Sequence, residues 1–260
     1  MSDLTVYLAQ VNQFWEDKQA NIEHLNYLIE EANIIKRGLL VLPEMFNTGF
    51  TTQPERNADI WGESSSLDWL IDKSKSLEIG IITSLIIEEG GHYFNRLVFV
   101  SDGKLLGWYN KNYLFSLAGE NKKFTPGNER HIFEFNGWKI LPLICYDLRF
   151  PELSRIKMQE GIPEYEILVY VANWPEKRIE HWKKLLEARA IENLSYCIGV
   201  NRTGLDGNNN AYSGDSKVVN PVGESILEME QQMEGISSVS LNFEFINTTR
   251  SMFGFLNDIK

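Results

Sequence analysis

The chain has 260 residues, of which 43% are hydrophobic, 12% aromatic and 23% charged. This globular composition allows a sizeable core and excludes disordered, collagen-like and coiled-coil chains. The formal net charge of −11 disfavours binding to nucleic acid or to an anionic membrane surface, and no apolar run approaches the ~20 residues of a membrane-spanning helix.

Apolar strands and amphipathic helices alternate along the first part of the chain. A strand at Leu4–Val11, a helix that runs to Arg37 and a strand at Gly38–Leu42 together predict a βαβ unit. The helix carries apolar residues at i, i+3 and i+4 spacing from Ile22 to Ile35. The elements expected next are a helix near Ser65–Leu77, a strand at Ile79–Ile87, and a hairpin of strands Asn95–Ser101 and Lys104–Asn110.

The second part of the chain continues this alternation. The strands expected there are His131–Phe135, Lys139–Cys145, Glu166–Ala172, Ser195–Asn201, Ser216–Asn220, Ser225–Met229 and Ser237–Leu241, with helices from about Pro151 and at Glu180–Glu192. Because strands such as Ile140–Ile144 are apolar throughout, both faces of their sheet must be covered, and layers of helices are expected to flank the sheets. No linker, repeat or low-complexity tract divides the series, so residues 1–260 are interpreted as a single α/β domain.

The cysteines and the N-terminal residues indicate the compartment. Met1–Gln10 contain neither a basic segment nor a long apolar segment, so they do not resemble a secretory signal, and we expect a cytoplasmic protein. Cys145 and Cys197 are too few for a disulfide framework or a Cys-rich zinc site. The histidines lack the spacing of metal ligands, and the glycines form no nucleotide-binding loop. We therefore expect neither a metal nor a cofactor.

Four polar residues directly follow apolar strands, where ligands bind in α/β folds. They are Glu44, Lys111, Cys145 and Asn173. A carboxylate, an ammonium group and a thiol can serve as base, charge stabiliser and nucleophile in attack on a carbonyl group. We also expect a helix after Cys145, with Asp147 as its N-cap, to lower the pKa of the thiol. Taken singly, Glu44 and Lys111 could equally form an ordinary ion pair, and Cys145 could be a core residue.

Three motifs surround these residues in order along the chain. They are Leu42-Pro43-Glu44-Met45-Phe46, Tyr109-Asn110-Lys111 with Leu114-Phe115, and Ile144-Cys145-Tyr146-Asp147-Leu148-Arg149-Phe150-Pro151-Glu152. Downstream lie Ala172-Asn173-Trp174-Pro175, His181-Trp182, Ala188-Arg189-Ala190-Ile191-Glu192-Asn193 and Gly199-Val200-Asn201-Arg202. In order and spacing these segments resemble the nitrilase, or carbon-nitrogen hydrolase, superfamily over nearly the whole chain, most closely its ω-amidase branch.

The resemblance implies a four-layer αββα sandwich of the nitrilase type and a homodimer. It also implies a second carboxylate after the Lys motif, and Glu120 in Leu117-Ala118-Gly119-Glu120 fits. Without the resemblance, Glu120 would be interpreted as a solvated loop charge. Tyr113 stands where related sequences often have His, a position expected to line the pocket.

The resemblance and the chemistry of these groups predict an amidase that forms a thioester on Cys145. Glu44 is expected to accept the thiol proton, while Lys111 and the Tyr146 backbone N–H hold the oxyanion. Glu120 is expected to orient Lys111 or to share the role of base. The reaction cleaves a terminal carboxamide and releases ammonia, without a cofactor.

An ω-amidase substrate such as 2-oxoglutaramate or 2-oxosuccinamate also carries a carboxylate, which must be paired when it leaves water. Arg149 and Arg178 are the nearest basic residues in the sequence, and Asn173 and Trp174 are expected at the pocket wall. Each has a structural alternative. Arg149 could pair with Glu152, Arg178 could be a surface charge, and Trp174 could fill the core.

Other functions remain compatible with the sequence. The chain could be an N-carbamoyl amino acid hydrolase or an aliphatic amidase of the same superfamily, or a catalytically silent interaction module. The presence of all three residues Glu44, Lys111 and Cys145 argues against a catalytically silent module. Cys197 lies in the middle of a predicted strand and is expected in the core, and the expected partners are a small-molecule amide and a second copy of the chain.

Overall fold

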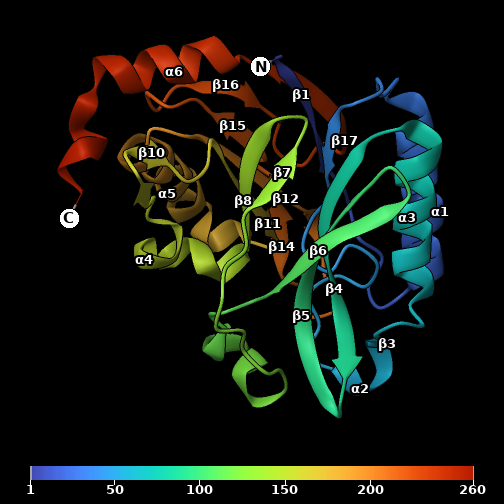
Figure 1. The fold of residues 1–260 in the computed structure, drawn as a ribbon. Helices are drawn as coiled ribbons and strands as arrows, with labels where there is room; N and C mark the ends of the chain where they lie inside the picture. Colours follow the sequence, from blue (N-terminus) through green and yellow to red (C-terminus); the bar gives the residue numbers. More distant parts are fainter. Residues whose placement is uncertain (1, 260) are drawn as a thin grey trace.

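Two β-sheets face each other in the computed structural model, which describes residues 2–259 (Figure 1). The first sheet has the order β17 (Gly235–Leu241), β1 (Leu4–Gln10), β2 (Leu39–Val41), β4 (Gly80–Glu89), β5 (His92–Ser101) and β6 (Lys104–Asn110), with β3 (Asp59–Ile60) paired to β4. The second has the order β16 (Ser225–Glu228), β15 (Lys217–Val219), β12 (Tyr196–Asn201), β11 (Ile167–Ala172), β8 (Trp138–Ile144) and β7 (Phe133–Phe135).

Helices cover the outer sides of both sheets, as the apolar strands require (Figure 1). On the first sheet lie α1 (Lys18–Glu31) and α3 (Ser65–Leu77), whose buried residues Leu25, Ile29, Leu67 and Leu70 join one core cluster. On the second sheet lies α5 (Ile179–Asn193), and α6 (Phe243–Met252) contacts the segments that lead into β11 and β12. These layers confirm the expected αββα sandwich.

A second core cluster lies between the sheets. Val6, Leu8 and Val41 from the first sheet belong to the same cluster as Ile140 and Ile144 from the second. Because apolar side chains alternate along each strand, one face of each sheet is buried against the other sheet and the opposite face against helices.

In each sheet, the strands that precede the predicted site residues run in the same direction, so their carboxyl ends lie at the same edge of that sheet. Strands β1, β2 and β4 are parallel, and because β5 is antiparallel to both neighbours, β6 runs in the same direction as β4. In the second sheet β8, β11 and β12 are parallel. The loops after β2, β6, β8 and β11 therefore carry the residues singled out at strand ends.

Several predicted boundaries differ from the structure. The first helix ends at Glu31 rather than near Arg37, because Asn33 adopts a left-handed conformation (φ 45°), and Ile35 is 56% exposed instead of packed. The helix expected from Pro151 is a single turn, α4 (Pro151–Ser154). The sequence also did not predict α6.

The remaining elements are short. They are α2 (Pro54–Asn57), β9 (Met158–Gln159), β10 (Ile162–Pro163), β13 (Thr203–Leu205), β14 (Ala211–Ser213) and the 3₁₀ turns η1 (Ser116–Ala118), η2 (Glu120–Lys122), η3 (Cys145–Arg149), η4 (Glu176–Arg178) and η5 (Gly254–Asp258). Within residues 2–259, no helix combines the length and apolarity needed to cross a membrane.

Candidate active site

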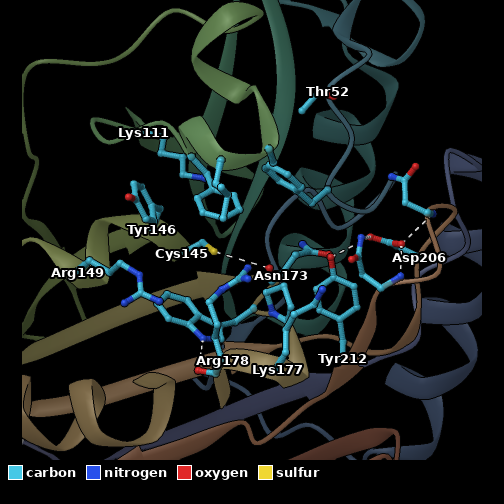
Figure 2. A pocket seen from close by; sticks show the side chains of 18 residues that line it. Thr52, Lys111, Cys145, Tyr146, Arg149, Asn173, Lys177, Arg178, Asp206 and Tyr212 are labelled. Carbon is cyan, nitrogen blue, oxygen red and sulfur yellow. Dashed lines mark hydrogen bonds between the residues drawn. The ribbon is translucent and has the colours of Figure 1, made fainter. Parts of the chain in front are cut away.

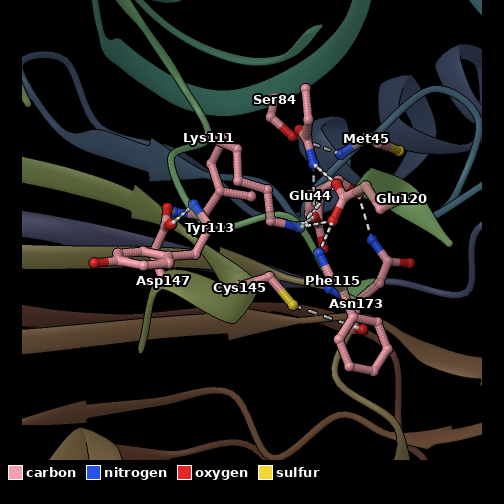
Figure 3. Close-up of polar contacts among 12 residues, drawn as sticks. Glu44, Met45, Ser84, Lys111, Tyr113, Phe115, Glu120, Cys145, Asp147 and Asn173 are labelled. Carbon is pink, nitrogen blue, oxygen red and sulfur yellow. Dashed lines mark hydrogen bonds and ion pairs between the residues drawn. The ribbon is translucent and has the colours of Figure 1, made fainter. Parts of the chain in front are cut away.

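Two charged residues predicted at strand ends, Glu44 and Lys111, meet Glu120, which the resemblance implied in the loop after the Lys motif, in one buried cluster. Lys111, just after β6, donates hydrogen bonds from Nζ to Glu44 Oε1 at 2.8 Å and to both carboxylate oxygens of Glu120 at 3.0 Å (Figure 3). All three side chains are at most 1% exposed. Glu44 and Lys111 therefore do pair, but within a buried cluster of three charges, and the solvated loop charge considered for Glu120 is wrong.

Burial and mutual charge set the electrostatics of this cluster. Burial alone would lower the pKa of the Lys111 ammonium, but the charges of Glu120 and Glu44 outweigh it and raise the pKa above its usual value. Burial raises the pKa of Glu120, Lys111 opposes this rise, and the like charge of Glu44 adds to it. Lys111 therefore stays cationic between two carboxylates that share its charge.

Cys145 lies beside this cluster at the carboxyl end of β8, where the chain turns sharply. Its backbone has φ 42°, a left-handed conformation that is strained for a residue with a side chain, and its Sγ is 3.9 Å from the carbonyl oxygen of Asn173. The thiol side of the residue reaches the cavity described below, although Cys145 is only 8% exposed. The turn aims the sulfur out of the sheet toward that cavity (Figure 2).

The expected lowering of the thiol pKa is wrong. Burial, followed by the negative charge of Glu44, raises the pKa of Cys145 well above its usual value, and the charge of Lys111 offsets this only in part. The segment after Cys145 is the five-residue 3₁₀ turn η3, which supplies no long helix dipole. The resting sulfur is therefore a neutral thiol that needs a base.

Asp147 is not the N-cap residue but belongs to the turn itself. Its carboxylate accepts hydrogen bonds from the Ile144 backbone N–H at 3.0 Å, the Tyr113 backbone N–H at 2.9 Å and the Tyr109 hydroxyl at 2.9 Å. Asp147 is fully buried, and burial raises its pKa to about 7. It ties the turn of Cys145 to the chain on both sides of Lys111.

Asn173, after β11, positions Glu44 from the opposite sheet. Its backbone N–H donates to Glu44 Oε2 at 2.9 Å, and its side-chain amide donates to the Glu44 carbonyl oxygen at 2.6 Å. The sequence predicted a substrate contact for Asn173. The structure places it at the cavity wall with its amide nitrogen already engaged by Glu44.

A cavity of about 350 Å³ opens over Cys145 (Figure 2). Of the predicted residues, Lys111, Cys145, Tyr146, Arg149, Asn173, Trp174 and Arg178 line it. Sequence reasoning missed several others, namely Phe50, Thr52, Phe115, Leu117, Ala118, Pro175, Lys177, Asp206, Asn208, Asn210 and Tyr212. Most of these come from loops, where residue type alone does not indicate which side chains point inward.

Two guanidinium groups stand in this cavity without a counter-ion. Arg149 lies 4.7 Å over the ring of Trp174, and Arg178 lies 5.3 Å from the ring of Phe115. Within residues 2–259 neither forms an ion pair. Arg149 has a guanidinium nitrogen 3.2 Å from His181 Nδ1 instead of pairing with Glu152, whose carboxylate accepts from the Tyr113 hydroxyl. Burial, and then the charge of Arg178, lowers the pKa of Arg149. An anion bound here would be favoured.

Tyr113 does not line the cavity. Its ring stacks on Phe150 with centroids 3.6 Å apart, and its hydroxyl donates to Glu152 Oε1 at 2.6 Å. Cys197 is fully buried, as expected for a core residue. In the part of the chain from residue 2 to 259, no group of three or more His, Cys, Asp or Glu side chains is arranged to hold a metal ion.

Comparison with known proteins identifies the class to which this fold and site belong. Residues 5–251 match the family described as carbon-nitrogen hydrolase. The chain belongs to the carbon-nitrogen hydrolase family, within the nitrilase superfamily that the three motifs resemble.

Individual relatives cover almost the whole chain. The ω-amidase YafV of Escherichia coli (strain K12) is 38% identical over 97% of this chain and 95% of its own length. The 2-oxoglutaramate amidase of Bacillus subtilis (strain 168) is 30% identical over 98% of this chain and 97% of its own. A crystal structure of a CN-hydrolase superfamily protein from Xanthomonas campestris superposes with a TM-score of 0.95 at 32% identity, over 100% of this chain and 98% of that one.

Proposed function

We propose that the protein is an ω-amidase, which hydrolyses the terminal carboxamide of a short dicarboxylic acid such as 2-oxoglutaramate or 2-oxosuccinamate. The observation that carries this proposal is the cavity itself, which has Cys145 and Lys111 at one side and, at another, Arg149 and Arg178, neither of which pairs with a carboxylate of residues 2–259. The similarity to the Escherichia coli ω-amidase and the Bacillus subtilis 2-oxoglutaramate amidase supports the assignment.

The acylation step begins with the neutral thiol. Glu44 accepts the proton from Cys145 as the sulfur bonds to the amide carbon, and the carbonyl electrons move onto oxygen. Lys111 and the Tyr146 backbone N–H stabilise that oxyanion. When the intermediate collapses, the C–N bond breaks, Glu44 returns the proton to the leaving nitrogen, and ammonia departs from a thioester.

Hydrolysis of the thioester uses the same base. Glu44 accepts a proton from a water molecule whose oxygen attacks the thioester carbon, and a second oxyanion forms at the same place. Collapse breaks the C–S bond, Glu44 returns the proton to the sulfur of Cys145, and the carboxylic acid product leaves and releases its remaining proton to water. Glu120 keeps Lys111 oriented through both steps, because it accepts two of the hydrogen bonds from that ammonium.

Arg149 and Arg178 bind the carboxylate at the far end of the substrate. Both are half-buried, so an ion pair there is screened less than at the surface. The ring of Trp174 supports the Arg149 guanidinium, which keeps it directed into the cavity. A simple aliphatic amide has no group to occupy this site.

A substrate panel tests the proposal. Ammonia release from 2-oxoglutaramate should exceed release from an N-carbamoyl amino acid and from an uncharged aliphatic amide. Arg149→Gln should raise the KM for 2-oxoglutaramate about tenfold or more, while Arg155→Gln, which changes an exposed arginine outside the cavity, should not. Preference for another substrate would reassign the chain within the family, and no turnover at all would favour a silent interaction module.

We further propose that the enzyme is a cytoplasmic homodimer. Both cysteines are free, as is usual in a reducing compartment such as the cytoplasm. Exposed apolar side chains occur in α6, in η5 and at the residue that joins them: Phe245, Met252, Phe253 and Phe255. Cell fractionation would test the location.

A further inference from the structure

Asn95 contacts three of the four groups proposed to carry the reaction. Its side-chain amide donates to Glu44 Oε1 at 2.8 Å and to Glu120 Oε1 at 3.2 Å. Its backbone carbonyl oxygen accepts a hydrogen bond from the Lys111 backbone N–H at 2.9 Å. It lies in β5, is 1% exposed, and belongs to none of the motifs that carry the family resemblance.

The site uses only the donor half of this amide. Asn95 Oδ1 has no hydrogen-bond partner among residues 2–259, although burying an unpaired carbonyl is unfavourable. Exchanging the oxygen and nitrogen would direct lone pairs at two carboxylates, so the orientation of the amide follows from its neighbours. The two N–H groups therefore explain why an asparagine stands here.

A neutral hydrogen-bond donor between Glu44 and Glu120 can orient both carboxylates, whereas a second cation would also change the basicity of Glu44. Two carboxylates share the single charge of Lys111, and their mutual repulsion is relieved by any donor placed between them. A second ammonium would also stabilise the ionised form of Glu44 and make it a poorer base for the thiol. An amide orients both carboxylates without adding charge.

We infer that Asn95 is a positioning residue of the amidase reaction, whose amide holds Glu44 and Glu120 in the geometry that the thiol and the lysine require. This inference rests on the proposed roles of Glu44, Lys111 and Glu120. Asn95 is not part of the cavity wall, so its removal should act on kcat and leave KM within about twofold.

The amide contacts Glu44 and Glu120, and the ionisable groups that interact with this pair of carboxylates define the expected pH effect. Lys111 lies between the two carboxylates, Cys145 interacts with Glu44 and Lys111, and Asp147 interacts with Lys111. Loss of a hydrogen-bond donor disfavours the ionised form of a carboxylate and raises its pKa. In Asn95→Leu the acid limb of kcat/KM should therefore move up by about one pH unit, and kcat should fall roughly 10- to 100-fold.

The experiment compares Asn95→Leu and Asn95→Asp with the control Asn193→Leu. Asn193 is equally buried and also uses its side-chain amide, but its partners are backbone groups of Arg189 and Ile156, away from the cavity. Asn95→Asp keeps the shape and adds a third carboxylate, so its acid limb should move further than that of Asn95→Leu. Asn193→Leu should lose thermal stability while its pH profile stays at the wild-type position.

A second readout needs no substrate. The rate at which iodoacetamide alkylates Cys145, followed by mass spectrometry across pH, also depends on proton transfer from the thiol and should shift with the acid limb. If the wild type does not hydrolyse 2-oxoglutaramate, the proposed substrate fails while alkylation still tests Asn95. Unshifted profiles in folded Asn95 variants would overturn the inference, as would failure of both variants to fold when Asn193→Leu folds.

Discussion

At the scale of single residues, the site separates a neutral nucleophile from a permanent cation. The Cys145 thiol is protonated at rest because burial and Glu44 raise its pKa, whereas Lys111 stays charged because two carboxylates surround it. In the proposed mechanism, proton transfer to Glu44 therefore accompanies attack by the sulfur, and Lys111 supplies the positive charge that the oxyanion needs.

Removal of the nucleophile should abolish turnover without unfolding the protein. Cys145→Ala deletes the sulfur that forms the thioester, so ammonia release from 2-oxoglutaramate should fall to background while the melting temperature changes little. Cys197→Ala is the control, because that thiol is fully buried in the core: it should lower stability by about 1–3 kcal/mol and keep kcat. Near wild-type turnover in Cys145→Ala would remove this residue from the mechanism.

Lys111→Met should affect both catalysis and stability. The oxyanion loses its cationic partner, which should lower kcat by about 10²–10³. Two buried carboxylates also lose their counter-ion, at a cost of about 3–5 kcal/mol in the free energy of unfolding.

A second buried lysine separates these two effects. Lys217 is 3% exposed and pairs with Glu187 at 2.9 Å and Glu228 at 2.8 Å, outside the cavity. Lys217→Met should therefore lose stability with kcat unchanged. Unchanged kcat in Lys111→Met, measured with denaturant unfolding on both variants, would leave Lys111 with a structural role only.

Residue type and strand-end position were enough to place Glu44, Lys111, Cys145 and Asn173 at one site, but they could not reveal Asn95. Within β5, Asn95 and Arg96 are adjacent polar residues, and the alternation of a strand predicts that one of them faces solvent. Both are 1% exposed. Two adjacent polar residues in a mostly apolar strand were the available indication of a buried polar role. The partners of Asn95, Glu44 and Glu120, are distant in the sequence, so only the folded structure identifies them.

At the scale of elements, the turn η3 couples the nucleophile to the lysine. Tyr113, which the sequence placed at the pocket, instead donates its backbone N–H to Asp147. Asp147 also accepts from the backbone N–H that precedes Cys145. A strained left-handed residue persists only where its surroundings hold it, and this carboxylate is one of the groups that hold the turn.

The stability that Asp147 contributes should depend on pH. Burial raises its pKa to about 7, whereas an unfolded aspartate titrates at about 3.9. The folded state binds the proton more tightly, so this contribution is fully present below about pH 4 and is lost as the pH rises through 7. The side chain in Asp147→Asn cannot ionise. Its amide nitrogen, itself a donor, must also face one of the three groups that donate to Asp147 in the wild type.

Asp147→Asn should consequently be less stable than the wild type at pH 4, and the difference should shrink as the pH rises toward 8. Urea unfolding of both proteins at several pH values measures this difference. A stability difference that is constant over that range would show that Asp147 does not titrate as its burial implies.

Helix and strand boundaries followed the sequence where apolar periodicity was strong. The predictions for α3 and β6 match the structure, because the caps of α3 at Ser64 and Glu78 and the turn before β6 are local signals. The helix α6 was missed because Phe243–Met252 combines aromatic and β-branched residues that suit a strand equally well. Its N-cap, Asn242, was the local signal available.

At the scale of the whole molecule, the site depends on how the two sheets are assembled, because its residues come from both of them. Glu44 and Lys111 follow strands of the first sheet, and Cys145 and Asn173 follow strands of the second. The last strand, β17, returns to pair with β1 in the first sheet. Local patterns predicted β17 but could not predict this pairing, because it joins segments at the two ends of the sequence. That residues 1–260 form a single domain stays a prediction, for which one cooperative melting transition is the test.

The proposed homodimer leads to a prediction about the C-terminal surface. Met252 is 71% exposed and Phe253 is 43% exposed, side by side at the end of α6, where a monomer would leave them in water. If this surface forms the interface, a glutamate at either position would bury a charge on association, and Met252→Glu and Phe253→Glu should be monomers. Tyr27→Glu is the matched control, because Tyr27 is 60% exposed on α1, at the other side of the molecule (Figure 1).

Sedimentation velocity at micromolar concentration should give twice the mass of the chain for the wild type and for Tyr27→Glu, and the mass of one chain for the other two variants. A wild-type monomer would contradict the homodimer, and dimers in all variants would place the interface elsewhere.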